Sequence, residues 1–492
     1  MRLKLEGKIN SLYVQSLCMM FFRGEKFPVH EDNPRGELTI KAIDKDEGIS
    51  CLVKLIYDGR EVTSEHFERY DSFDKYERAS KTCIGHAIFK ACSSLTGYVP
   101  PWGLLTGIRP SVVANELIDK YGQEKAYSIL KEKYILSGEK ANLAIQVAIN
   151  EKNIISKYDN SSCSIYVSIP FCPTRCTYCS FISYATDKLF KLIPNYVDRI
   201  VDELDETFEL INYLGLKVVT VYIGGGTPTM LSDNQLVKLL STVHKHLGNN
   251  RLVEFTLEGG RPDTITKEKL SVLKKYGVDR ISVNPQSLND SVLKNIGRHH
   301  TSNDFFKSYE LVKKSGISII NTDLIAGLDG DTFESFKDTL DKIVILSPEN
   351  ITVHSFSVKK SAQILQDDKG IYNLDGEDAI KSVNYAYKTL IQNGYIPYYM
   401  YRQKNTISDL ENVGYAKPEA IGTYNVLMMG DDHTVFGIGA GATTKLVRKN
   451  GENREILRIF SHKYPYEYLQ DNQNAKSKII DFFEGRTNDE NN

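Results

Sequence analysis

The chain lacks the features that would direct it into a membrane, along a secretory route or onto nucleic acid. Its 492 residues contain no apolar run of 18 or more, so no membrane span is predicted. The opening letters, MRLKLE, do not begin a signal peptide. Lys and Arg number 61 against 63 Asp and Glu, a net charge of −2, and no Lys/Arg cluster favours a nucleic-acid partner. We therefore expect a cytoplasmic protein with no nucleic-acid partner.

The cysteines do not form a disulfide framework. Eight cysteines occur without the regular spacing of a small secreted domain, which indicates a reducing compartment. Hydrophobic residues make up 41% and charged residues 25%, which is ordinary for a chain with sizeable cores. Four cysteines near the N-terminus are too scattered to indicate a metal cluster: Cys18, Cys51, Cys83 and Cys92.

Three further cysteines stand together in the stretch IYVSIPFCPTRCTYCSF, as Cys172, Cys176 and Cys179. Three thiolates in one short loop can bind three irons of a 4Fe–4S cluster, and the fourth iron then has no protein ligand. An open iron allows a cluster to bind and cleave a small molecule as well as to relay electrons. This spacing resembles that of the radical S-adenosylmethionine (SAM) superfamily, whose open iron is chelated by SAM.

Two simpler interpretations of the three cysteines remain. A structural zinc site needs four protein ligands, and the nearest further cysteine, Cys163, is separated by the extended run Ser164 to Pro170. Seven extended residues span roughly 23 Å, which is too far for one site. Buried structural thiols are the other interpretation, but the polar residues between these cysteines make a poor core segment. The spacing favours a cluster.

A glycine-rich turn follows downstream in VYIGGGTPTML. The apolar strand predicted over 218–223 runs into Gly224, Gly225 and Gly226, and a polar helix is predicted from Ser232. Glycines at the carboxyl end of a strand let a ligand approach the backbone closely. Alone this would be an ordinary tight turn, but together with the cysteine loop it resembles the superfamily segment that holds the SAM amino group.

The middle of the chain alternates strand and helix patterns. Apolar β-branched runs occur at 165–170, 218–223, 252–257, 280–283, 317–326 and 350–357, and amphipathic segments at 191–214, 233–247, 266–276, 303–315 and 332–346. Six βα units predict an α/β fold with a parallel sheet curled into a full or partial TIM-like barrel. Special residues follow successive strands, where barrel enzymes place their chemistry: the cysteines, the glycines, Glu258, Gln286 and Asp323.

With these motifs in view, the chain resembles the oxygen-independent coproporphyrinogen III oxidase family, and within it the branch called HemZ. The resemblance covers roughly 161–445 and rests on the cysteine stretch and GGGTPT, then EFTLEGGRPDT, RISVNPQSLND, GRHHT and NTDLIAGLDGDT, and further YYMYRQKN, ENVGY and VFGIGAGATTK. The N-terminal PWGLLTGIRP is also similar to HemZ. The family implies a radical SAM partial (β/α)6 barrel with a 4Fe–4S cluster and SAM as cofactors.

The resemblance also assigns roles by position. Gly225, Gly226 and Thr227 would hold the SAM amino group, with Glu258 beside the same end, and Arg298 would pair with the SAM carboxylate. Chemistry agrees, since a guanidinium binds a carboxylate in a planar fork and ribose hydroxyls need acceptors. The remaining positions are the ribose partners Gln286 and Asp323, the adenine neighbours Ile325 and Ala326, and Tyr166 next to the cofactor. Singly, Arg298 and Asp323 could be surface charges or caps.

The implied reaction is oxidative decarboxylation of two propionates of coproporphyrinogen III to give protoporphyrinogen IX. A 5′-deoxyadenosyl radical from SAM would abstract a hydrogen, and an electron donor such as flavodoxin or ferredoxin would reduce the cluster. Candidate propionate partners are Arg175, Arg261, and Arg402 or Lys404, although each could equally be a solvated charge. Arg175 and Tyr166 are the predicted catalytic residues.

Two positions depart from the best-characterised branch. Phe181 stands where that branch has a fourth cysteine, and Ser168 where it has a histidine. These changes leave the three iron ligands intact but weaken transfer of the substrate mechanism. A heme-chaperone branch, HemW, also lacks the fourth cysteine; it typically carries an HNxxYW-like segment, which this sequence does not contain. A heme-binding protein and a radical SAM enzyme with another substrate, RNA included, therefore remain as alternatives.

Several motifs have plain structural interpretations. His299 and His300 could donate protons or bind an iron porphyrin, but paired loop histidines are usually exposed. His354 is expected to be a hydrogen-bonded core histidine, and GIGAGA at 437–442 a glycine-rich turn against the barrel. Three regions are expected: an N-terminal α+β extension over 1–160 of unknown role, the barrel over 161–360, and a C-terminal α+β region over 361–492 that covers the active site and ends in a polar tail from about 475.

Overall fold

The computed structural model describes most of the chain, in two compact units. The described residues are 1–22, 24–28, 34–70, 76–179, 183–248, 250–357, 376–403, 406–450, 453–471 and 475–485. Within them, the N-terminal unit holds Met1–Ile149 and Tyr401–Leu410, and the sheet unit holds Asn150–Lys369, Gly376–Met400 and Glu411–Asn492. The barrel and C-terminal regions expected from the sequence thus fall into one unit.

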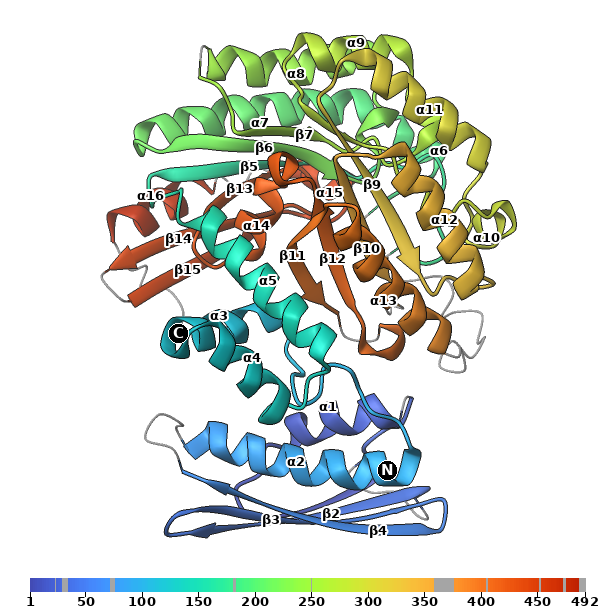
Figure 1. Ribbon diagram of the computed structural model, residues 1–492. Helices are drawn as coiled ribbons and strands as arrows, with labels where there is room; N and C mark the ends of the chain where they lie inside the picture. Colours follow the sequence, from blue (N-terminus) through green and yellow to red (C-terminus); the bar gives the residue numbers. More distant parts are fainter. Residues whose placement is uncertain are drawn as a thin grey trace. The chain divides into compact units, whose positions relative to one another are not determined.

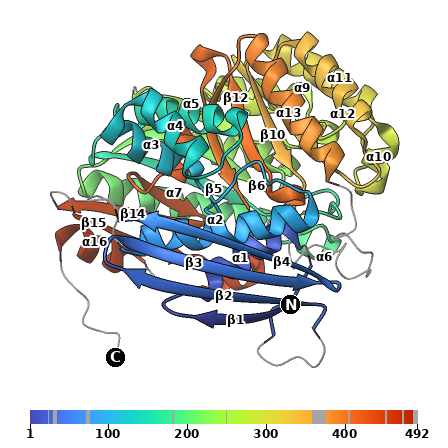
Figure 2. The same ribbon diagram turned by 60° about the horizontal axis from the view of Figure 1, so that its bottom comes forward.

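The N-terminal unit is built on a four-stranded sheet with two helices on one face (Figures 1 and 2). The strands lie in the order of the chain, β1 parallel to β2 and the others antiparallel: β1 Arg2–Glu6, β2 Gly36–Lys45, β3 Gly48–Tyr57 and β4 Arg60–Arg69. The β3–β4 turn uses positive φ at Asp58 (47°) and Gly59 (75°), which matches the right-handed twist of a hairpin. The helices of this region are α1 Ser11–Phe21, α2 Tyr76–Thr96, α3 Pro110–Tyr121, α4 Gln123–Glu132 and α5 Gly138–Ile155.

The alternation of side chains explains why α1 and α2 cover this sheet. Ile49, Cys51, Val53 and Leu55 point to one face of β3 and are fully buried. They pack with the apolar sides of α1 and α2 into a single core. The alternating runs 36–42 and 50–57 predict the strands β2 and β3, and the patterns over 72–95 and 111–156 predict helices; no local pattern predicts α1, β1 or β4.

The sheet unit contains an open eleven-stranded sheet. Its order is β11-β12-β10-β9-β8-β7-β6-β5-β13-β14-β15, and the run from β10 to β13 is parallel throughout. The predicted strands are β5 Ser162–Ile169, β6 Lys217–Gly225, β7 Glu254–Leu257, β8 Arg280–Ser282, β9 Ile319–Ala326 and β10 Asn350–Ser355. The six consecutive parallel strands expected from the periodicity are confirmed, and among the described residues the sheet does not close into a barrel.

Helices connect these strands and lie along one side of the sheet (Figure 1). Amphipathic patterns predicted the long ones within a few residues: α7 Ile193–Tyr213, α8 Asp233–Leu247, α9 Lys267–Lys275, α11 Ser302–Ser315 and α12 Phe333–Leu346. Local chemistry sets their starts, since Ser232 and Thr301 form capping boxes with Gln235 and Asp304. Two short helices, α6 Asp187–Phe190 and α10 Asp290–Asn295, and the later α13 Glu377–Gln392 complete this set.

The C-terminal segment extends the same sheet at both edges. β12 Glu411–Ala416 pairs antiparallel with β10, and β13 Thr434–Ile438 pairs parallel with β5. The remaining elements are β11 Ile396–Arg402, α14 Thr423–Met429, β14 Thr443–Asn450, β15 Asn453–Phe460, α15 Pro465–Gln470 and α16 Lys476–Glu484. The prediction of a polar tail from about 475 is wrong for residues 476–484. They form α16, in which Ile479 is buried.

The glycine-rich segment 437–442 comprises the last two residues of β13 and the turn that leads into β14. A Cβ on Gly439 would lie 2.7 Å from the carbonyl oxygen of Ser168 in β5, so only glycine allows this close approach. Ser168 in turn donates to the carbonyl oxygen of Ala440 at 2.8 Å. Among the described residues no helix is long and apolar enough to cross a bilayer.

Candidate cluster and cofactor site

The carboxyl ends of β5 and β6 bring the cysteine loop and the glycine turn together. The backbone N–H of Gly226 donates to the carbonyl oxygen of Ile169 at 2.8 Å, and that of Thr227 to Phe171 at 2.8 Å. The β5–β6 register continues to Ile169 and Gly225. Because these bonds run from the glycine turn to the start of the cysteine loop, the two motifs form one backbone unit at the rim of the sheet.

Each of the three cysteine sulfurs has a polar neighbour of its own. Thr227 Oγ1 donates to Cys172 Sγ at 3.3 Å, and Arg261 Nη2 donates to Cys176 Sγ at 3.1 Å. Cys179 Sγ lies 3.6 Å from Ser183 Oγ. Donors directed at sulfur favour the thiolate, the form that binds iron. Burial raises the pKa of the Cys172 thiol, and the Thr227 hydroxyl and then the Arg261 charge lower it; bound iron would stabilise the thiolate further.

In the described part of the chain, no three His, Cys, Asp or Glu side chains converge on a point that would hold a single metal ion. Each cysteine of a three-cysteine loop binds a different iron of a cluster, whereas a structural zinc site needs four ligands on one shared ion.

The glycine turn leaves room beside the cysteine sulfur. A Cβ on Gly226 would lie 2.6 Å from the carbonyl oxygen of Phe171 and 3.0 Å from Cys172 Sγ. Gly225 has φ +108°, a backbone conformation that disfavours other residues. A Cβ on Gly224 would lie 2.9 Å from the carboxylate of Glu258. Glycine is therefore required at each position, for contact or for conformation.

Glu258 follows β7 and is held in a buried aromatic setting. Its Oε1 accepts a hydrogen bond from the hydroxyl of Tyr222. Burial, and to a smaller extent the charge of the nearby Asp323, raise the pKa of Glu258 to about 7. The rings of Tyr166, Tyr222 and Tyr424 stack beside it, with centroids 4.4 Å apart for Tyr222 and Tyr424 and 6.2 Å for Tyr166 and Tyr222. Tyr424 comes from α14, and no local sequence pattern predicts it as a site residue.

Arg298 is buried at the same rim and reaches toward the cluster loop. Its Nη1 donates to the carbonyl oxygens of Asn284 (2.8 Å) and Gly260 (3.3 Å), and its Nη2 to the hydroxyl of Tyr178 at 3.4 Å. Its Nε has no partner in the described structure. A buried guanidinium with a free N–H can accept an anionic ligand.

Gln286 and Asp323 lie side by side after β8 and within β9. The backbone N–H of Gln286 donates to the carbonyl oxygen of Asp323 at 3.1 Å. Gln286 has φ +67°, an unfavourable conformation for a residue other than glycine, and its buried Oε1 has no partner among the described residues. Backbone strain together with an unsatisfied buried acceptor is a feature of ligand sites.

Asn284 fixes Asp323 and was missed by the sequence reasoning. Its Nδ2 donates to Asp323 Oδ2 at 2.7 Å, and its Oδ1 accepts from the Asp323 backbone N–H at 3.1 Å. Asn321 Nδ2 donates to the other carboxylate oxygen at 2.8 Å. Each oxygen keeps further acceptor capacity for a hydroxyl. Ile325 and Ala326, the predicted adenine neighbours, end the same strand and are buried.

His300 corrects an expectation. The sequence predicted exposed histidines after Arg298; His299 is exposed, but His300 is only 3% exposed. Neither of its ring nitrogens has a partner in the described structure. Burial and then the charges of Arg298 and Arg261 lower the pKa of His300 to about 3, so its imidazole is neutral. His354, by contrast, is hydrogen-bonded to Asn412 at 3.3 Å, as expected.

The predicted arginines differ in where they lie. Arg261 is buried against the cluster loop, whereas Arg175 is exposed on it. Arg402 belongs to the N-terminal unit. Its guanidinium donates to the carbonyl oxygen of Leu105 and lies over the Trp102 ring, so these contacts within the unit account for the arginine. Lys404 and Phe181 lie outside the described residues.

The residues at this rim fit a cluster with a polar ligand beside it. Three sulfurs with nearby polar groups can hold irons, and three buried polar atoms lack partners among the described residues: Gln286 Oε1, Arg298 Nε and Arg261 Nη1. An unpaired buried polar atom costs about 1–3 kcal/mol, so such a set is expected where a ligand supplies the missing bonds. Glycines keep the space beside Cys172 free of side chains.

Comparison with known proteins agrees with this geometry. Residues 166–343 match the Radical SAM superfamily. The chain is 32% identical over 501 residues, 98% of each chain, to the oxygen-independent coproporphyrinogen-III oxidase-like protein HemZ of Bacillus subtilis. It is 32% identical over 282 residues to the heme chaperone HemW of Lactococcus lactis, covering 57% of this chain and 69% of that one.

A solved structure is similar in fold. Coproporphyrinogen III oxidase (HemN) from Escherichia coli, a radical SAM enzyme, aligns with a TM-score of 0.51 and 22% sequence identity. The alignment covers 66% of this chain and 71% of that one. The cofactors that go with the superfamily are a 4Fe–4S cluster and SAM.

Proposed function

Because the chain belongs to the oxygen-independent coproporphyrinogen-III oxidase-like family of radical SAM proteins, we propose that it decarboxylates coproporphyrinogen III oxidatively to protoporphyrinogen IX. The observation that carries the proposal is the rim of the sheet, where Thr227 and Arg261 direct donors at two of the three cysteine sulfurs. Arg261 and Arg298 also keep buried polar atoms that have no partner among the described residues. Similarity to HemZ over 98% of both chains supports a tetrapyrrole substrate. The eight free cysteines support a cytoplasmic location.

Different residues of the rim bind the cluster and the two ends of SAM. Cys172, Cys176 and Cys179 ligate three irons. When bound, the cluster and SAM supply a 5′-deoxyadenosyl radical that abstracts hydrogen. The turn of Gly225, Gly226 and Thr227 with the Glu258 carboxylate binds the SAM amino group.

The other end of SAM has its own set of residues. The guanidinium of Arg298 binds the SAM carboxylate as a planar fork. Gln286 Oε1 and the fixed Asp323 carboxylate accept from the ribose hydroxyls. Ile325 and Ala326 line the adenine, and Tyr166 lies in the stack beside Glu258.

The substrate chemistry balances as two identical steps. Each propionate loses one hydrogen atom from the carbon next to the pyrrole, then carbon dioxide, and forms a vinyl group with release of one electron to an acceptor. A small electron-transfer protein of the flavodoxin or ferredoxin type supplies the reducing electron. Arg261, with one N–H free among the described residues, is a closer candidate for a propionate than the exposed Arg175.

A heme chaperone is the second candidate. The identity to HemW over 57% of this chain favours it, and the missing HNxxYW-like string argues against it. A chaperone would bind heme stably without turning over SAM.

An anaerobic assay separates these functions. The iron-reconstituted protein is incubated with SAM, a reductant and coproporphyrinogen III, and products are identified by mass spectrometry. Protoporphyrinogen IX with methionine and 5′-deoxyadenosine, all lost in Cys176→Ala, is the expected result. SAM cleavage without a porphyrin product would overturn the substrate and keep the radical chemistry, while tight heme binding without SAM cleavage would favour the chaperone.

A further inference from the structure

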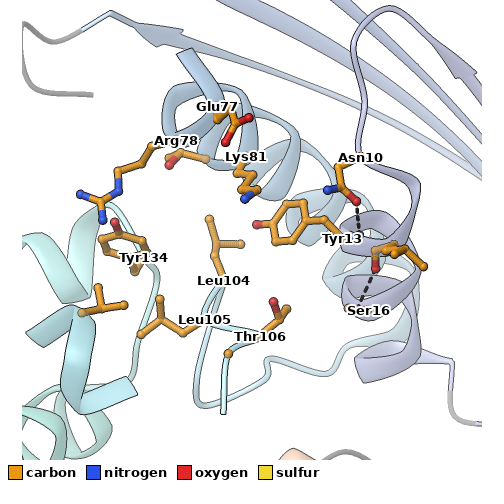
Figure 3. A pocket seen from close by; sticks show the side chains of 14 residues that line it. Asn10, Tyr13, Ser16, Glu77, Arg78, Lys81, Leu104, Leu105, Thr106 and Tyr134 are labelled. Carbon is orange, nitrogen blue, oxygen red and sulfur yellow. Dashed lines mark hydrogen bonds between the residues drawn. The ribbon is translucent and has the colours of Figure 1, made fainter. Parts of the chain in front are cut away.

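The N-terminal unit contains a pocket of its own, of about 770 Å³ (Figure 3). This volume is within the range of roughly 300–1,000 Å³ that small-molecule sites occupy. Residues of α1, α2 and the segment from Leu104 to Gly107 line it, together with Val113 and Tyr134. All belong to the N-terminal unit, so the pocket is separate from the cluster site.

The floor of the pocket is apolar. Leu104 lies near its centre with Leu105 to one side (Figure 3). Leu12 and Val113 also line it. Leu104 and Leu105 are themselves 4% and 8% exposed, so they form a fixed surface continuous with the core. An apolar floor of this kind favours the hydrophobic body of a ligand.

One cation at the wall has no counter-ion. Lys81 extends from α2 toward the cavity (Figure 3), and within the described structure it makes no hydrogen bond or ion pair. Arg78, the neighbouring cation, is paired with Glu116 at 2.8 Å. Glu77 also lines the pocket and is exposed. One unpaired ammonium suits one carboxylate group of a ligand.

A phenol lies next to this ammonium. Tyr13 from α1 directs its hydroxyl toward Lys81 (Figure 3), and the hydroxyl has no hydrogen-bond partner in the described part of the protein. Gly85 of α2 permits this position, because a Cβ there would lie 2.7 Å from the Tyr13 hydroxyl and 3.1 Å from Leu104. Glycine inside a helix costs about 1 kcal/mol relative to alanine, and here it makes room for the Tyr13 hydroxyl and the Leu104 side chain.

We propose that this pocket binds an amphipathic carboxylate, with the carboxylate on Lys81 and Tyr13 and the apolar body over Leu104 and Leu105. An ammonium and a phenol hydroxyl are both donors, and a carboxylate accepts from both. The propionate edge of a porphyrin and the head of a fatty acid share this chemistry. All residues of this site belong to the N-terminal unit, and the proposal is independent of the proposed function.

The chain carries its own reporter for the test. Trp102 is its only tryptophan, is buried, and precedes Leu104 by two residues. The full-length protein is titrated with coproporphyrin III in one series and with laurate in another, and Trp102 fluorescence and equilibrium dialysis both report binding. Binding of the porphyrin alone would identify a tetrapyrrole site, binding of laurate alone a fatty-acid site, and binding of neither would overturn the proposal.

Matched variants show where the probe binds. Lys81→Glu is expected to weaken the bound probe at least about tenfold, since it replaces attraction by repulsion. Lys90→Glu makes the same change on the opposite side of α2, where Lys90 is exposed and does not line the pocket, and should leave affinity unchanged. Circular dichroism melting confirms that both variants fold.

Two further variants complete the set. Gly85→Ala should weaken binding without a change of charge, because its methyl group displaces Tyr13 or Leu104. With laurate as the probe, Arg261→Met should have no effect, because Arg261 belongs to the cluster site and does not line this pocket. Equal affinity for wild type and Lys81→Glu, or a loss of binding in Arg261→Met instead, would overturn the proposal by assigning the probe to another place.

Discussion

The guanidinium of Arg261 donates one hydrogen bond to Cys176 Sγ, at 3.1 Å, and another to the carbonyl oxygen of Thr174, at 2.7 Å. One side chain from the loop after β7 therefore holds both the backbone of the cysteine loop and a cluster sulfur. Arg261 is only 3% exposed, so its charge acts on the sulfur with little screening by water. We propose that Arg261 positions the cysteine loop and tunes the reduction potential of the cluster.

Replacing Arg261 by Met should make the cluster harder to reduce. Hydrogen bonds and positive charge near a cluster sulfur stabilise the reduced state, so their loss lowers the reduction potential. We expect iron and sulfide to be retained at a reduced level and SAM cleavage to fall about tenfold to hundredfold. A redox titration followed by electron paramagnetic resonance gives the potential. Arg251→Met, at an exposed position, is the control, and an unchanged potential in Arg261→Met would contradict this role.

The three loop cysteines should be required for the cluster, and Cys163 should not. Cys163 is fully buried in β5, and burial raises the pKa of its thiol, as expected of an inert core cysteine. Single Ala variants of Cys172, Cys176 and Cys179 should lose most of their iron and all SAM cleavage. Iron and sulfide are measured per chain after anaerobic reconstitution. Cys163→Ala should hold as much iron as the wild type; a shared loss in all four variants would point to misfolding instead.

Gly226→Ala should remove SAM binding by a steric effect. Its methyl carbon would lie 2.6 Å from the Phe171 carbonyl oxygen and 3.0 Å from Cys172 Sγ, so the turn or the cysteine loop must move. We expect SAM affinity to fall at least about tenfold, with iron content less affected, measured by equilibrium dialysis of the reconstituted protein. Gly430→Ala is the control, since it has φ −73° and its Cβ would meet nothing closer than 3.6 Å. Equal SAM affinity in both variants would show that the turn does not contact SAM.

Much of this site was readable from the sequence because its signals are local. Fixed spacing identified Cys172, Cys176 and Cys179, and period-two and period-3.6 patterns gave the six parallel strands and their helices. Residues at the ends of parallel strands meet at one rim, so Glu258 and Asp323 could be placed near the cluster before any coordinates.

What was missed depends on contacts between distant segments. Tyr424 reaches the stack from α14, and β13 adds beside β5 after more than 260 intervening residues; no local pattern encodes either pairing. Asn284 holds Asp323, yet an asparagine after a strand is usually only a turn residue. Arg402 looked available for a propionate in the sequence, but its guanidinium is occupied by backbone carbonyl oxygens of its own unit.

Glu258 should make SAM binding depend on pH. Its pKa is raised to about 7, with burial as the largest cause, so the carboxyl is mostly neutral below this value and charged above it. Only the charged form attracts the SAM ammonium, and SAM affinity is therefore expected to rise as pH increases from about 6 to about 8. Dialysis at several pH values measures this slope.

Glu258→Gln provides the control, because glutamine keeps an oxygen for the Tyr222 hydroxyl but has no charge at any pH. Its SAM affinity should be lower than that of the wild type at about pH 8 and should rise less with pH.

The folding stability of the SAM-free wild type should change with pH in the opposite direction to its SAM affinity. Between the unfolded pKa near 4.3 and the folded value, the folded wild type binds more protons, so its free energy of unfolding falls as pH rises. At about pH 8 the SAM-free variant should thus be more stable than wild type by up to about 3 kcal/mol, a difference that vanishes below about pH 4. If SAM affinity and the free energy of unfolding changed with pH by the same amount in wild type and Glu258→Gln, Glu258 would not titrate in this range.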